Sequence, residues 1–143
     1  HRVMVCLSSR SPGSEVLLRK GARLASRLNA PWYAVYIQTP AESVEKVDAA
    51  TQRRIANTMT LAQQLGGVPL PFKGTDVVST IEAFVREYGI DHIILGRSRR
   101  PWYQRWFGRS VLDRLLQTVR GVDVTIVDSL GKEDSDRHKA CIE

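Results

Sequence analysis

Short β-prone runs and longer stretches with helical periodicity alternate along most of the chain, and this order constrains the fold more than any other feature. The apolar, β-branched or aromatic runs lie at 2–7, 32–37, 68–72, 91–95 and 122–127. Apolar residues spaced by three and four predict helices from residue 14 to about 28, then at 44–65, 77–88 and 110–119. Strands separated by helices pair in parallel through right-handed crossovers. We therefore predict an α/β protein with a doubly wound, parallel, open sheet and helices on both faces.

Local signals mark several ends of these elements. Asp76 is placed to cap the third helix, and Gly89 is placed to end it. Gly66 can end the second helix in the left-handed conformation that glycine tolerates. Pro69 and Pro71 cannot donate to a sheet ladder, so the run that contains them is expected at an edge of the sheet.

The predicted domain covers residues 1–128, and residues 129–143 form a charged linker or tail with little to bury. The chain starts at His1, and no signal peptide follows, so we expect a piece of a longer protein. No run approaches the roughly 20 apolar residues that a membrane-spanning helix needs. Cys6 and Cys141 are too few for a disulfide framework and favour a reducing cytoplasm. The three histidines show no metal-ligand spacing, so no metal is predicted.

Two loops are candidates for ligand binding. In open parallel sheets, ligands bind beyond the carboxyl ends of strands where the strand order reverses. The loops in question follow the first and fourth strands, at 8–13 and 96–108, and supply hydroxyl groups, a Gly96-Arg-Ser98 turn and several arginines. The candidates for holding an anion are Ser8, Ser9, Ser11, Gly96, Arg97, Ser98, Arg99 and Arg109. The alternative is that these arginines are solvated or pair with acidic residues of the chain itself.

The second loop also combines arginines with aromatic residues. Trp102 precedes Trp106 by four residues, and Tyr103 precedes Phe107 by four, so a helical turn would form two aromatic rows. We favour docking on a neighbouring domain through a surface made of Arg100, Trp102, Tyr103, Arg105, Trp106 and Phe107. Packing on the domain's own sheet remains the alternative, and no nucleic-acid-binding motif accompanies these residues.

Motifs that would indicate an enzyme are absent from the sequence. It contains no nucleophile elbow, no Walker-type phosphate loop, and no cysteine with a plausible histidine partner. Its aspartates stand where helix caps and strand entries usually place them. The domain is therefore expected to bind rather than to catalyse.

The chain resembles the universal stress protein family, and more closely its members that form a domain of potassium-responsive sensor histidine kinases of the KdpD type. The resemblance covers roughly 2–128 and is carried by the segments 19–25, 31–37, 95–100 and 109–115. It implies a five-stranded sheet in the order 3-2-1-4-5 and a place in the cytoplasm ahead of the kinase's membrane helices.

Members of the family that bind ATP carry Gly-x-x-Gly, nine residues, and then Gly-Ser or Gly-Thr, with an aspartate after the first strand. This chain keeps Gly96, but Arg99 replaces the second glycine and Arg109 precedes Ser110. Leu7 and Ser8 stand where the aspartate would be. The added positive charge keeps an anion attractive there.

A second pattern of the family concerns cyclic di-AMP. Some KdpD proteins bind it through Ser-x-Ser, twenty residues, and then Phe-Thr-Ala-x-Tyr. This chain has Ser9-Arg-Ser11 and, twenty residues later, Trp32-Tyr33-Ala34-Val-Tyr36. The alternative is that 32–37 is simply a core strand.

The sequence therefore predicts a regulatory domain of a sensor histidine kinase that binds an anionic nucleotide, with cyclic di-AMP or ATP as candidates, or docks on another domain of the parent kinase. Two alternatives remain. One is a ligand-free interaction module. The other is a free-standing stress protein that hydrolyses ATP and forms a homodimer through its fifth strand.

Overall fold

The computed structural model describes residues 1–7, 14–38, 48–96 and 109–127. The strands are β1 (Val3–Leu7), β2 (Trp32–Gln38), β3 (Val68–Lys73), β4 (His92–Gly96) and β5 (Asp123–Val127). The helices are α1 (Ser14–Arg27), α2 (Ala49–Gln64), α3 (Val77–Tyr88) and α5 (Arg109–Thr118). The predicted alternation of strands and helices is confirmed. The predicted tail at 129–143 lies outside the described residues.

All four strand pairings are parallel, and the strand order is β3-β2-β1-β4-β5. The predicted sheet and its order are therefore confirmed. The strand that contains Pro69 and Pro71 lies at one edge, as their missing N–H groups require. β1 is central and is buried along its whole length.

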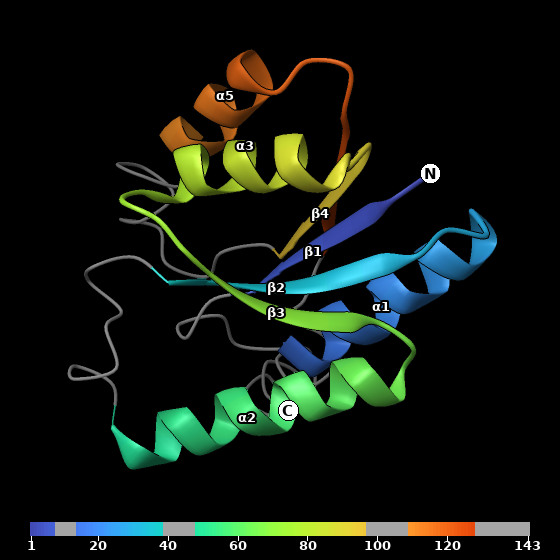
Figure 1. Cartoon of the computed structure of the whole chain (residues 1–143), viewed down its shortest axis with the longest axis vertical. Helices are drawn as coiled ribbons and strands as arrows, with labels where there is room; N and C mark the ends of the chain where they lie inside the picture. The colour runs from blue at the N-terminus through green and yellow to red at the C-terminus, as the bar shows by residue number, and fades with distance from the viewer. Residues whose placement is uncertain (8–13, 39–47, 97–108, 128–143) are drawn as a thin grey trace, which may run out of the picture.

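Helices cover both faces of this sheet (Figure 1). α1 and α2 lie on one face, and α3 and α5 lie on the other. Alternate side chains of β1 point to opposite faces, so Val5 joins the core under α1 while Met4 joins the core under α3. Each face thus has its own apolar core, and the central strand contributes to both.

The observed helix ends follow capping chemistry. The Asp76 carboxylate accepts a hydrogen bond from the Ser79 N–H, and Gly89 ends α3 with φ of 64°, so both predicted ends are confirmed. The predicted start of the second helix near residue 44 is wrong. Asp48 has an extended backbone and caps the helix through the Thr51 N–H, so α2 begins at Ala49. Residues 44–47 lie outside the described part of the chain.

Two further properties of the described residues bear on the protein's setting. None of their helices combines the length and the apolar character that crossing a bilayer requires. Cys6 is a free cysteine on β1, and burial raises the pKa of its thiol well above the ordinary value. The thiol is therefore neutral and shielded in the folded chain.

Candidate functional site

The candidate site lies at the edge of the sheet that is formed by the carboxyl ends of its strands, where β1 and β4 end side by side. Their parallel register pairs Val3 with His92 and Val5 with Ile94. The paired residues extend to Val5 and Ile94, and each strand ends two residues later, at Leu7 and at Gly96. The two segments predicted to bind a ligand, 8–13 and 97–108, therefore leave the sheet from neighbouring positions.

This edge is also where the chain reverses its direction across the sheet. From β1 the chain passes through α1 to β2, on one side, and from β4 it passes through α5 to β5, on the other. The two crossover helices lie on opposite faces of the sheet (Figure 1). Such a switch point leaves room between diverging loops and directs helix amino termini toward it, an arrangement that suits an anionic ligand.

Six of the thirteen predicted ligand-binding residues lie outside the described part of the chain. These are Ser8, Ser9, Ser11, Arg97, Ser98 and Arg99. The predicted docking surface, made of Arg100, Trp102, Tyr103, Arg105, Trp106 and Phe107, is outside it as well. Gly96 ends β4, and Arg109 and Ser110 open α5, with only their backbone described. The roles predicted for these side chains stay predictions.

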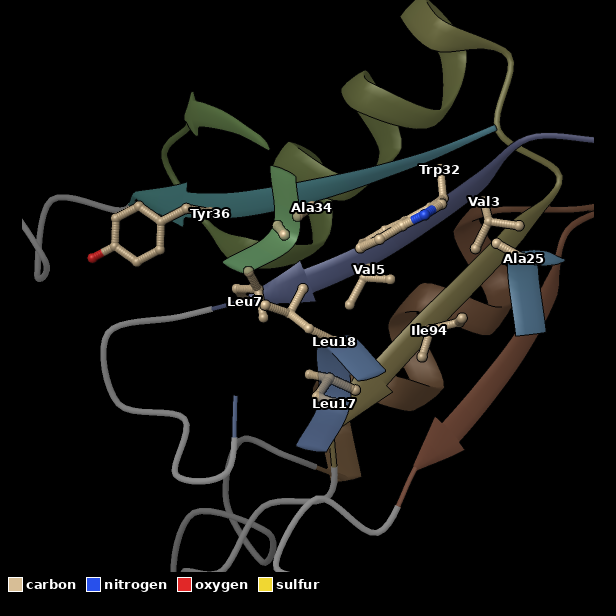
Figure 2. Close-up of a cluster of buried hydrophobic side chains, with 11 residues drawn as sticks. Val3, Val5, Leu7, Leu17, Leu18, Ala25, Trp32, Ala34, Tyr36 and Ile94 are labelled. Atoms are coloured by element: carbon tan, nitrogen blue, oxygen red, sulfur yellow. The ribbon is translucent and has the colours of Figure 1, made fainter. Parts of the chain in front are cut away.

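The predicted residues of β2 are divided between the two ends of that strand. Trp32 pairs with Val3 at the start of β1, whereas Tyr36 pairs with Leu7 at its end. Four residues of strand separate them by about 13 Å. Figure 2 shows Tyr36 at one end of the buried cluster and apart from Trp32, with the Tyr36 hydroxyl directed away from the other labelled side chains. Of the two aromatic residues, only Tyr36 lies at the edge where the candidate loops begin.

The same predicted residues are also divided between the two faces of the sheet. Trp32, Ala34 and Tyr36 belong to the core under α1 and α2. Tyr33 points the other way. The centroid of its ring lies 5.7 Å from the ring centroid of Phe84 and 5.3 Å from that of Tyr88. The structure thus places Tyr36 at the candidate edge, Ala34 on the same face beside the middle of β1, and Tyr33 in a separate aromatic cluster.

One contact near this edge could not be predicted from the sequence. Arg114 of α5 places a guanidinium nitrogen 3.9 Å from an Asp76 carboxylate oxygen at the start of α3. Both side chains are about half exposed, at 57% and 47%, so the pair contributes little to stability. The pair instead helps to position α5, the helix that follows the second candidate loop, against the capped start of α3.

The cap at Asp76 makes a testable contribution to stability. Hydrogen bonds from the Ser79 N–H and hydroxyl lower the pKa of this carboxyl below its ordinary value. We expect D76A to lower the free energy of unfolding by about 1 kcal/mol at neutral pH, through loss of the cap. Because the folded-state pKa is depressed, the stabilisation is present above the ordinary carboxyl pKa and is lost as pH falls through the lower folded value.

Urea unfolding of the native chain, D76A and D76N at several pH values checks this expectation. Asparagine also caps helices but does not titrate. D76N should therefore keep most of the stability at neutral pH and lose the part of the pH dependence that comes from Asp76. Equal destabilisation by both substitutions would assign the effect to the charge and to Arg114 rather than to the cap.

Comparison with known proteins shows the family to which the chain is similar. The model of the universal stress protein family matches residues 1–128. The sensor protein KdpD of Escherichia coli is 34% identical over 126 residues, which are 87% of this chain and 13% of that protein. The KdpD sensor protein of Mycobacterium tuberculosis is 30% identical over 126 residues, 88% of this chain and 14% of its own length. The chain therefore spans a small part of each relative.

Solved structures share the fold at lower sequence identity. A universal stress protein crystallised in complex with cAMP has a TM-score of 0.66 and 19% identity, and covers 90% of this chain and 97% of its own. A universal stress protein from Archaeoglobus fulgidus in complex with dAMP has a TM-score of 0.61 and 17% identity. The match covers 89% of this chain and 97% of that protein's chain. These similarities support the same arrangement of strands and helices.

Proposed function

The chain belongs to the universal stress protein family and is homologous to a domain of KdpD sensor proteins, and from this premise we propose that it is a nucleotide-binding regulatory domain of a KdpD-type sensor histidine kinase. The proposed ligand is an anionic nucleotide, with cyclic di-AMP and ATP as the first candidates. The proposed setting is the cytoplasm, and the proposed partners are the other domains of the kinase. Its free, buried Cys6 thiol is compatible with a reducing compartment.

The observation that supports this proposal most directly is the parallel pairing of β1 with β4, which end at Leu7 and at Gly96. It brings the start of a hydroxyl-rich segment beside the start of an arginine-rich one, at the switch point of the sheet. Arginine guanidinium groups bind phosphate oxygens in bidentate geometry, and serine hydroxyls add hydrogen bonds. Two proteins with this fold have structures in complex with cAMP and with dAMP, which are nucleotides of the proposed class.

A bound nucleotide can regulate the kinase only through unequal affinity for two arrangements of the parent protein. The segment 97–108 leads into α5, and α5 contacts α3 through Arg114 and Asp76. Ligand binding at the edge therefore has a short physical route to the outer face of the α3 and α5 layer. We expect a neighbouring domain to contact this outer face and to respond there to nucleotide binding at the candidate edge.

Isothermal titration calorimetry of the chain with ATP and with cyclic di-AMP, at a stated salt concentration, tests the proposal. We expect binding of at least one nucleotide and a weaker affinity in R97Q/R99Q. Charged hydrogen bonds worth about 1.5–3 kcal/mol each predict a loss of at least about tenfold for each arginine that contacts phosphate. The control R86Q/R120Q removes the same charge from exposed positions away from this edge and should bind as the native chain does. Absence of heat with both nucleotides, or equal losses in both variants, contradicts the proposal.

A further inference from the structure

The two helical layers of the molecule differ in charge. α1 and α2 together contain six basic residues and a single acidic one, Glu15. The basic residues are Arg19, Lys20, Arg23, Arg27, Arg53 and Arg54. On the other face, α3 and α5 together contain three acidic residues, Glu82, Glu87 and Asp113, and three basic ones, Arg86, Arg109 and Arg114. We call the outward side of α1 and α2 the basic face.

The fold directs several of these side chains away from the sheet. In α1, each of Arg19, Arg23 and Arg27 follows a buried residue by two positions, and two positions turn a helix by roughly 200°. In α2, Arg53 precedes Ile55 by two positions, and Ile55 is partly buried against the core. All four arginines are exposed. The charge therefore lies on the outer surface.

The two helices present this charge as one surface. α1 and α2 contact each other and lie in one layer on the same face of the sheet (Figure 1). Arg19 is paired with Glu15 at 3.2 Å. Among the described residues, Arg23, Arg27 and Arg53 form no ion pair. These three cations supply a field that is not neutralised within the described structure.

The chemistry of the basic face distinguishes between classes of partner. Protein interfaces usually have a core of large apolar or aromatic side chains. The exposed large hydrophobic residues of the described chain are Val68, Leu116 and Ile126, and none of them belongs to α1 or α2. A broad array of Lys and Arg without apolar anchors instead matches the anionic headgroups of a lipid bilayer, which attract basic residues through charge alone.

We propose that the basic face of α1 and α2 binds the surface of an anionic lipid bilayer. This contact uses side chains distinct from those of the proposed nucleotide site. It would hold the domain against the membrane with α3 and α5 on the far side of the sheet. The candidate edge would then lie at the margin of the contact rather than beneath it.

Co-sedimentation of the chain with lipid vesicles tests this proposal. Vesicles of phosphatidylcholine alone are compared with vesicles that contain phosphatidylserine, at low salt and at physiological salt. Each basic residue near an anionic lipid surface increases the affinity for that surface about fivefold. R23Q/R53Q should therefore weaken binding to the phosphatidylserine vesicles by about 25-fold, and higher salt should weaken binding of the native chain.

The control R86Q/R120Q lowers the net charge equally but leaves the basic face intact, so it should bind these vesicles nearly as the native chain does. Equal losses in R23Q/R53Q and in the control would overturn the proposal, since binding would then follow net charge alone. Native-like binding by R23Q/R53Q, or failure of the native chain to bind phosphatidylserine vesicles, would overturn it as well. Nucleotide titration of R23Q/R53Q keeps the two proposals separate, because that variant should retain native affinity for nucleotides.

Discussion

Replacing Phe84 by alanine is expected to lower the free energy of unfolding by about 3–5 kcal/mol, the range for removing a buried phenylalanine ring. Phe84 belongs to α3 and is fully buried on the side of that helix that faces the sheet. Its ring stacks on Tyr88 at a centroid distance of 4.2 Å and makes edge contacts with Tyr33 of β2 and Phe72 of β3. The ring therefore joins α3 to two strands, and its loss leaves a cavity that these neighbours cannot fill.

The size of this effect is large against the total stability of a domain, which is about 5–15 kcal/mol. Equilibrium unfolding in urea, followed by circular dichroism, measures it. The control is F84L, which keeps most of the apolar volume and should cost less than half as much. A loss below about 1 kcal/mol in F84A would contradict the packing described for this cluster.

The second large effect is expected from Gly67, which follows α2 and contacts Trp32. A Cβ atom added at Gly67 would lie 2.7 Å from two carbons of the Trp32 ring and 2.8 Å from a third. The ring is buried at 5% exposure and belongs to the core under α1 and α2, so it has little room to move. We expect G67A to lower the free energy of unfolding by about 1–3 kcal/mol through overpacking.

A double-mutant cycle separates this steric effect from a change in backbone preference. W32F removes ring atoms that the new methyl group would meet, although it leaves a cavity of its own. The double variant G67A/W32F should therefore be more stable than the two separate losses predict, by about 0.5–3 kcal/mol. Additive losses would show that the methyl group and the ring do not compete for space.

Local chemistry explains why much of the fold was predictable. Prolines at 69 and 71 remove ladder donors, so β3 had to lie at an edge, and the structure places it there. Asp76 and Gly89 act through contacts within one helical turn, which the sequence displays directly. The start of α2 was predicted too early because Val44 and Val47 are three residues apart and continue the helical spacing of apolar residues to the N-terminal side of the cap at Asp48.

The arrangement of the candidate site was less predictable. Alternation along a strand separates Tyr33 from Trp32, Ala34 and Tyr36, but it does not show which helices cover each set or which residue lies beside the end of β1. Those positions depend on the register between β1 and β2 and on the packing of the helices. The Arg114 to Asp76 contact joins two helices that are separated by a strand, so no local spacing could predict it.

The central claim is that a nucleotide binds where β1 and β4 end side by side, and amide chemical shifts test it most directly. Titration of the isotope-labelled chain with cyclic di-AMP or ATP should shift the amide signals of Leu7, Gly96 and Ser14, which border the candidate loops at this edge. The signals of Arg2, Gly89 and Asp91, at the opposite end of the sheet, should stay in place. Shifts confined to that opposite end, or no shifts with either nucleotide at millimolar concentration, would contradict the account.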